Sequence, residues 1–151
     1  MKVSITITGV SEVLTKLTLL KEGLSNYKAE LETTGEFLKN YYADFPFKFE
    51  GQVYGKNWAR LSPAYQARKS IKYVGKNILE ASGFMRTQFA FTSTSDYCRI
   101  FNNTEYFKYH QLGTKRMPQR LVMSLNAATN TAIAGIFKAG IDAKIEALSH
   151  L

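Results

Sequence analysis

The sequence is poor in the side chains on which most catalytic and metal sites depend. Its 151 residues include one cysteine and two histidines. A single cysteine, Cys98, excludes an internal disulfide and a cysteine-rich metal site. Because Cys98 lies in an apolar run with no helix start or histidine beside it, we interpret it as a packed strand residue rather than a reactive thiol. No cluster of carboxylates offers ligands to Mg²⁺ or Ca²⁺, so we expect no metal site.

Long apolar runs and phosphate-binding loops are also missing. No run approaches the roughly 18 residues of a membrane-spanning helix, and residues 1–6 do not resemble a signal peptide. We therefore expect a protein that makes no membrane contact and stays in the cytoplasm in which it is made. Gly51, Gly55 and Gly75 are too widely spaced for a Walker or dinucleotide-binding loop. We expect no cofactor and no small-molecule substrate.

Acidic residues are scarce in one region of a chain whose net charge is +8. Between residues 56 and 86 there are seven cations and one acid, Glu80. Such an excess favours contact with a phosphate backbone or an acidic protein surface, unless it only forms a solvated face. No nucleic-acid-binding motif accompanies the charge. Arg86 is the last of the seven, and the six candidate contact residues are Lys56, Arg60, Arg68, Lys69, Lys72 and Lys76.

The hydrophobic pattern predicts an α+β fold in a single domain spanning residues 1–151. Alternation over residues 3–8 predicts a half-buried strand. Apolar residues at spacings of four and three then predict one long helix over about 11–42, which ends before Pro46. We expect this helix to lie on a sheet, although it could also bend at Gly23 or Gly35 or project towards a neighbouring subunit.

The second half predicts a small antiparallel sheet packed against the long N-terminal helix and a C-terminal helix. Two strands are expected over 89–92 and 97–101, with another at 121–123. Ser62 is the predicted N-cap of a helix over 63–70. Residues 102–104 are expected to cap a short helix over 105–112. The apolar spacing of 126–148 predicts an amphipathic terminal helix.

Three side chains are candidates for a functional role. His110 could act as a general base, but no orienting group accompanies it, so we favour an imidazole that is hydrogen-bonded at a helix end. Trp58 either anchors the core or forms an interface hot spot, and we favour the core. Arg120 either pairs with a carboxylate or is solvated. We expect no catalytic residue and interpret the chain as a binding or structural protein.

The most informative stretch runs from Tyr106 to Val122, with the sequence YFKYHQLGTKRMPQRLV. Gly113 can supply the positive φ that closes a short helix, and Pro118 cannot continue one. The stretch resembles the "Y…HQ-x-G…(I/M)P-x-R" signature of the phage virion morphogenesis family, the small tail-completion proteins of long-tailed phages. The resemblance covers about residues 56–125. It rests on Trp58, Leu61, Tyr65, Arg68, Lys69, the segments 78–79 and 82–84, Tyr106, His110, Gln111, Gly113, Met117, Pro118 and Arg120.

The resemblance implies a non-enzymatic protein that completes the tail or joins it to the head. By analogy the chain would form a ring, with six as the expected number of subunits, in the virion of a phage or prophage. It would contact other tail, neck or connector proteins, and the basic stretch could face DNA in the channel. The implied interface or structural residues are Trp58, Tyr106, His110, Gln111, Gly113, Pro118 and Arg120. A nucleic-acid-binding protein and a small hydrolase that uses His110 are the alternatives.

Overall fold

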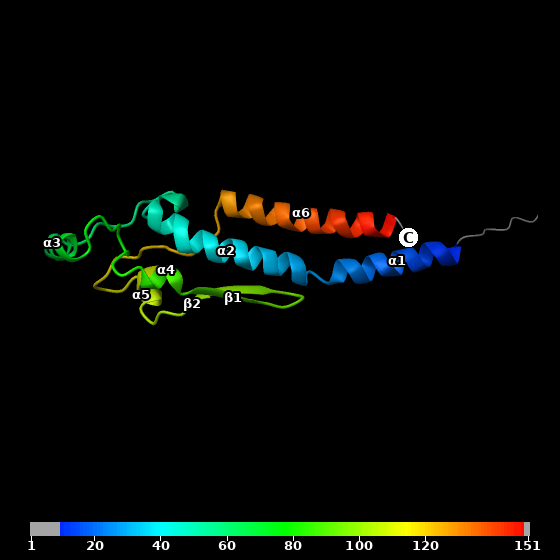
Figure 1. The fold of residues 1–151 in the computed structure, drawn as a ribbon, viewed down its shortest axis with the longest axis horizontal. Coiled ribbons are helices and arrows are strands. Elements are labelled where there is room, and N and C mark those ends of the chain that lie inside the picture. The colour runs from blue at the N-terminus through cyan, green and yellow to red at the C-terminus, as the bar shows by residue number, and fades with distance from the viewer. Residues whose placement is uncertain (1–9, 150–151) are drawn as a thin grey trace, which may run out of the picture.

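The computed structural model describes residues 10–149, and the strand predicted at 3–8 lies outside them. The described chain forms an elongated molecule (Figure 1). Two helices, α1 and α2, follow one another along its length, and the last helix, α6, runs beside both. The short helices α3, α4 and α5 gather at one end. The elements are α1 (Val10–Ser25), α2 (Lys28–Lys48), the 3₁₀ turn η1 (Gln52–Tyr54), α3 (Pro63–Lys72), α4 (Phe84–Thr87), β1 (Phe89–Ser93), β2 (Cys98–Asn102), α5 (Phe107–Leu112) and α6 (Ala127–Ser149).

The predicted α+β class is confirmed by an antiparallel hairpin that packs on α2. Strand β1 pairs with β2 in a register that runs from Phe89 opposite Asn102 to Ser93 opposite Cys98. A Cβ atom at Gly35 would lie 2.3 Å from the ring of Phe91, so a glycine is needed for α2 to approach the sheet this closely. Helix α6 packs on α2 as well, and Figure 1 shows it on the side away from the hairpin.

The predicted helix over 11–42 was wrong in its continuity and in its end. The chain breaks at Asn26 and Tyr27, not at either candidate glycine, and the Asn26 side chain accepts a hydrogen bond from the Lys28 amide at 3.0 Å. Such a local side-chain bond offers the backbone an alternative to the helix. Helix α2 then continues through Pro46. Pro46 and Phe47 are fully buried, and this burial offsets the hydrogen bond that proline removes.

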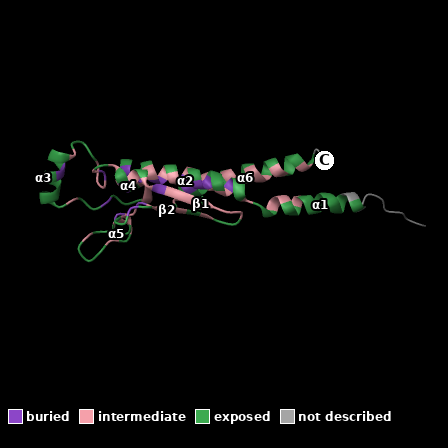
Figure 2. Ribbon diagram, turned by 60° about the horizontal axis from the view of Figure 1, so that its bottom comes forward, coloured by how far each residue is buried: buried purple, intermediate pink, exposed green. Residues whose placement is uncertain are grey.

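The hydrophobic core is small and lies at the C-terminal half of α2, near the start of β1 (Figure 2). The Phe47 ring meets Trp58 edge-on at 5.8 Å, and Trp58 is only 5% exposed, so the core interpretation of Trp58 is confirmed. Gly51 has a φ of +84°, and a Cβ atom there would lie 2.3 Å from the Trp58 indole. The buried hydrophobic residues are Leu38, Tyr42, Phe47, Trp58, Met85, Phe89 and Val122.

A buried ion pair fixes α6 beside α2. Lys144 Nζ lies 2.7 Å from Glu30 Oε1, and Glu30 is 4% exposed. The hydrogen bond from Lys144 lowers the pKa of Glu30, so the carboxylate stays ionised at neutral pH. A Cβ atom at Gly140 would lie 2.3 Å from Glu30 Oε1. Gly140 therefore leaves room for the carboxylate between the two helices.

The remaining predictions had mixed outcomes. The helix after Ser62 is confirmed, and the Ser62 hydroxyl accepts from the Tyr65 amide at 3.4 Å. The cap predicted at 102–104 was wrong, because α5 begins at Phe107 and the Asn102 side chain binds Thr104 instead. Cys98 lies in β2 as predicted. Residues 121–123 form no strand in the described structure. Within residues 10–149 no helix is long and apolar enough to cross a membrane.

Candidate functional site

The segment 120–124, which we call the clamped segment, is held by side chains rather than by a neighbouring strand. Four consecutive carbonyl groups in it each accept a hydrogen bond from a different side chain. Backbone groups that are satisfied in this way do not need a sheet, which explains why the predicted strand at 121–123 is absent. The four bonds are Trp58 Nε1 to Leu121 at 2.9 Å, the Tyr54 hydroxyl to Val122 at 2.7 Å, Gln111 Nε2 to Met123 at 2.7 Å and the Tyr42 hydroxyl to Ser124 at 3.2 Å.

Gln111 binds this segment through both atoms of its amide group. Its Oε1 accepts from the amides of Val122 and Met123, both at 2.9 Å, while its Nε2 donates to the Met123 carbonyl. Helix α5 carries Gln111 in its last turn. One side chain therefore replaces three of the backbone bonds that a neighbouring strand would have supplied.

Arg120 is buried at the start of the clamped segment. Its Nε donates to the Ala59 carbonyl at 3.0 Å and its Nη2 to the Arg60 carbonyl at 3.3 Å. The side chain is not solvated, and no carboxylate of the described residues forms an ion pair with it. Both interpretations of Arg120 from the sequence were therefore wrong. Arg120 instead links the clamped segment to the backbone of Ala59 and Arg60.

A tight turn joins α5 to the clamped segment. Gly113 has a φ of +74°, which confirms the predicted positive φ. A Cβ atom at Gly113 would lie 2.9 Å from the Gln119 backbone nitrogen, so the close approach also requires glycine. The Thr114 amide donates to the Met117 carbonyl at 2.8 Å across the turn. Pro118 follows, outside any helix, as the sequence predicted.

His110 lies half-buried next to this turn. Its carbonyl accepts from the Arg120 amide at 2.7 Å, and its ring meets Tyr106 edge-on at 6.1 Å. Its Nδ1 is buried and has no hydrogen-bond partner among the described residues, so the expected hydrogen-bonded imidazole was wrong. Burial, together with the charge of Arg120, lowers the pKa of His110.

The lowered pKa of His110 makes stability depend on pH. The unfolded chain binds a proton near pH 6.5, whereas the folded chain resists protonation until a lower pH. We expect the free energy of unfolding to fall as the pH decreases through this window, and His110→Gln to flatten the slope. Denaturant unfolding at pH 7.5 and 5.5 measures both. An equal slope in the two proteins would contradict the assignment.

A cleft of about 650 Å³ lies beside the clamped segment. Helix α3, the loop before α4, helix α5 and the turn at 114–118 form its walls. Four of the predicted interface or structural residues line it, namely Tyr106, His110, Pro118 and Arg120. The structure thus divides the predicted site residues. These four line the cleft, while Trp58 and Gln111 bind the backbone of the clamped segment.

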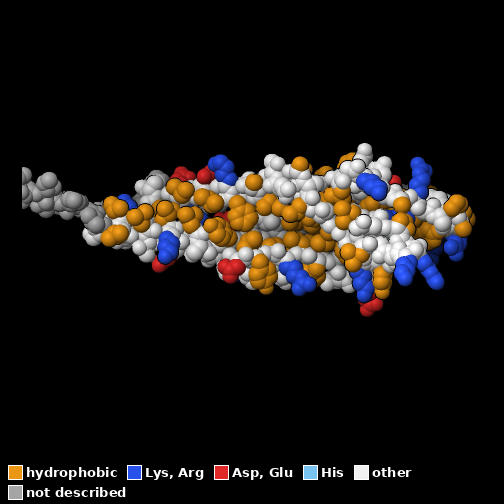
Figure 3. All heavy atoms as spheres, turned by 180° about the vertical axis from the view of Figure 1, so that it is seen from behind, with side chains coloured by type: hydrophobic (Ala, Val, Ile, Leu, Met, Phe, Trp, Pro, Cys, Tyr) orange, Lys and Arg blue, Asp and Glu red, His pale blue; other side chains and the backbone are white. Residues whose placement is uncertain are grey.

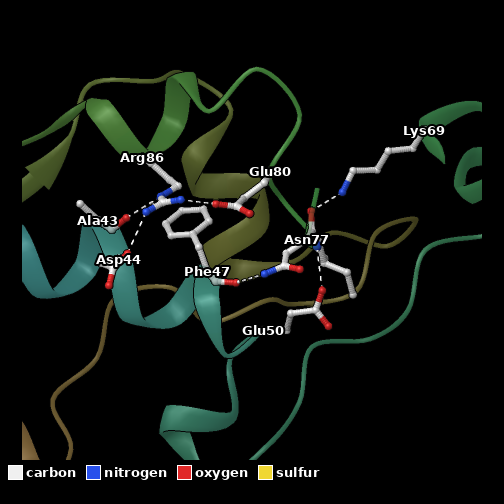
Figure 4. Close-up of polar contacts among 9 residues, drawn as sticks. Ala43, Asp44, Phe47, Glu50, Lys69, Asn77, Glu80 and Arg86 are labelled. Atoms are coloured by element: carbon white, nitrogen blue, oxygen red, sulfur yellow. Dashed lines mark hydrogen bonds and ion pairs between the residues drawn. The ribbon is translucent and has the colours of Figure 1, made fainter. Parts of the chain in front are cut away.

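The basic region from 56 to 86 is less open than its sequence suggests. Lys69 is only 5% exposed and its Nζ donates to the Asn77 carbonyl, and burial lowers its pKa (Figure 4). Arg86 binds the Ala43 carbonyl and the carboxylates of Asp44 and Glu80. The expectation that Lys69 is a surface contact was therefore wrong. The exposed candidates are Lys56, Arg60, Arg68, Lys72 and Lys76.

Sequence reasoning missed the two tyrosines that bind the clamped segment and the contacts of Arg86 with Asp44 and Glu80. Tyr42 and Tyr54 reach residues that are 82 and 68 positions away, and no local pattern marks such partners. Burial of their hydroxyl groups raises both pKa values, that of Tyr42 to about 12. The ion pair between Arg86 and Glu80 could have been suspected from the sequence, because Glu80 is the one acid among the seven cations.

Comparison of the chain with protein-family models, with curated proteins and with solved structures found no match in any of the three. The family resemblance therefore depends on the motif residues alone. Within the structure described, residues 10–149 contain no group of three or more metal-ligating side chains. The structure shows a hydrogen-bonded backbone segment beside an open cleft.

Proposed function

We propose that this chain is a structural protein of phage or prophage tail completion or head–tail joining, and that it acts as an oligomer. The observation that carries the proposal is the set of side-chain hydrogen bonds that hold the clamped segment. Trp58, Gln111 and Arg120 belong to the motif that resembles the tail-completion family. Trp58 and Gln111 bind the backbone of the clamped segment, and Arg120 links that segment to the carbonyls of Ala59 and Arg60. Residues with this role stabilise the backbone conformation of one segment. A structural protein needs such a fixed conformation in order to bind its neighbours.

The exposed apolar surface supports an oligomer. On α1 the side chains of Val13, Leu14 and Leu17 are each more than half exposed, and no described residue of α1 is buried. Figure 3 shows apolar side chains along the length of one face of the molecule. Contiguous apolar surface on a folded protein typically marks contacts with other proteins. The chain is elongated and its small core lies at one end. This agrees with a subunit whose exposed apolar surface is covered by neighbouring subunits.

In this proposal the subunits form a ring. Head-to-tail contacts that close by rotation use two different surfaces of each subunit. Other tail, neck or connector proteins would bind the faces of the ring, which belongs to the virion and is assembled in the bacterial cytoplasm.

Deleting the gene from the phage or prophage that encodes it tests the role. We expect lysates with normal numbers of heads and tails but few joined, complete particles when they are viewed by electron microscopy. Expression of the wild-type chain from a plasmid should restore them. Normal infectious particles without the gene would contradict the proposal.

A nucleic-acid-binding role remains a second candidate, because exposed cations gather at the α3 end of the molecule (Figure 3). Arg68 and Lys72 are exposed on α3, and Lys76 follows them. Gel-shift titration at low and moderate salt distinguishes the two candidates. A protein that neutralises several phosphates loses affinity steeply as salt rises, whereas an absence of binding at low salt excludes this role.

A further inference from the structure

We propose that the cleft beside the clamped segment receives the tip of the β-hairpin, residues 94–97, from a second copy of this chain. The inference rests on the proposed function, because a ring of identical subunits needs a contact between two unlike surfaces. It adds the identity of those surfaces. The cleft is one of them, and the hairpin tip is the other.

The walls of the cleft present aromatic side chains that the core leaves uncovered. Tyr65 of α3 is 43% exposed, Phe84 of α4 is 53% exposed and Tyr106 before α5 is 44% exposed. All three line the same hollow, although they come from three separate elements. A volume of about 650 Å³ lies in the range of pockets that bind ligands and anchor side chains. The cleft can therefore accept one or two large side chains.

The charges at the cleft favour a partner that carries a carboxylate. Arg60 and Arg116 are exposed, line the cleft and form no ion pair within the described part of the chain. The acid that lines it, Glu80, is already bound by Arg86. His110 also lines the cleft and has a buried Nδ1 without a partner. Because this nitrogen is buried, a partner in the cleft would contact the imidazole ring rather than Nδ1.

The hairpin tip carries the complementary groups side by side. Asp96 is exposed and forms no ion pair with a described residue, and Tyr97 next to it is 56% exposed. The tip is held in one shape, because Thr94 Oγ1 accepts from the amides of Asp96 and Tyr97, both at 3.2 Å. Exposed acids on helices, such as Glu22 and Glu146, sit on elements about 10 Å wide, which fit a cleft of this size less well.

The tip cannot fill the cleft of its own chain. Figure 1 shows the hairpin turn at the end of the strand pair that lies away from α3, α4 and α5. Five strand residues span about 16 Å, and the turn points further along the same direction. The hairpin tip lies beside the junction of α1 and α2, where the Tyr27 amide donates to the Ser95 carbonyl at 3.4 Å, and the cleft lies further along the molecule towards α3. These are two unlike surfaces at separate places, which head-to-tail association uses.

Exchange of the two charges tests the contact. We expect Arg116→Glu and Asp96→Arg to weaken self-association about tenfold or more, because each places like charges together. The double variant should restore much of the loss. Lys115→Glu is the control, since this neighbouring cation is exposed but does not line the cleft. Sedimentation velocity over a range of concentrations measures association, and circular dichroism confirms that each variant is folded.

The outcomes separate this contact from the proposed function. Oligomers that survive both single variants would overturn the cleft contact and leave a structural role intact. A wild-type chain that stays monomeric at every concentration would also overturn it, while the gene deletion still tests the role. Loss of nucleic-acid binding in Arg116→Glu without any change in mass would show that the cleft serves a phosphate backbone instead.

Discussion

Replacing Gln111 with leucine is expected to lower the free energy of unfolding by about 4 kcal/mol. Leucine has nearly the same size, so the change removes hydrogen bonds and leaves the volume almost unchanged. The amides of Val122 and Met123 and the Met123 carbonyl would lose their partners. Val122 is completely buried. Each unpaired buried backbone group costs about 1–3 kcal/mol, since water cannot reach it.

Gln119→Leu is the matched control for this experiment. Gln119 is exposed and makes one side-chain hydrogen bond, to the Gln111 carbonyl at 3.0 Å. Its loss should cost less than about 1 kcal/mol, because water can replace the bond. Denaturant unfolding can be followed by the fluorescence of Trp58, the only tryptophan. Equal effects of the two variants would mean that the clamp does not hold the segment as described.

The regular elements were predictable where a local pattern decides them. The hairpin, the helix after Ser62 and the terminal helix α6 each carry a periodicity or a cap in their own sequence. The break at Asn26 was not predicted, because the apolar spacing continues through it and a short asparagine side chain decides it locally. The persistence of α2 through Pro46 depends on burial, which only the tertiary structure supplies.

The site shows the same division. The turn at Gly113 followed from the motif, because a positive φ and a proline five positions later are local signals. The absence of a strand at 121–123 did not follow, since an apolar run has the same pattern whether a strand or four side chains satisfy its backbone. The sequence shows which segment is apolar. It does not show what satisfies its carbonyl groups.

Arg120→Ala is expected to lower the free energy of unfolding by about 3 kcal/mol. The change removes two hydrogen bonds from a charged donor and leaves the carbonyls of Ala59 and Arg60 without these partners. A bond from a charged group contributes about 1.5–3 kcal/mol. The variant no longer buries a charged guanidinium, and this offsets part of the free energy lost with the two hydrogen bonds. Arg116→Ala in the neighbouring turn is the control, because Arg116 is exposed, and its effect should stay within about 0.5 kcal/mol.

A third variant, Arg120→Met, separates the hydrogen bonds from the packing of the side chain. Methionine keeps much of the volume but donates nothing, so we expect a loss of about 2 kcal/mol. Urea unfolding of the three variants under identical conditions gives the comparison. A methionine variant as stable as the wild type would show that the free energy cost of burying the guanidinium equals the stabilisation from its hydrogen bonds. In that case packing, rather than the tie between Ala59 and the clamped segment, would account for the effect of alanine.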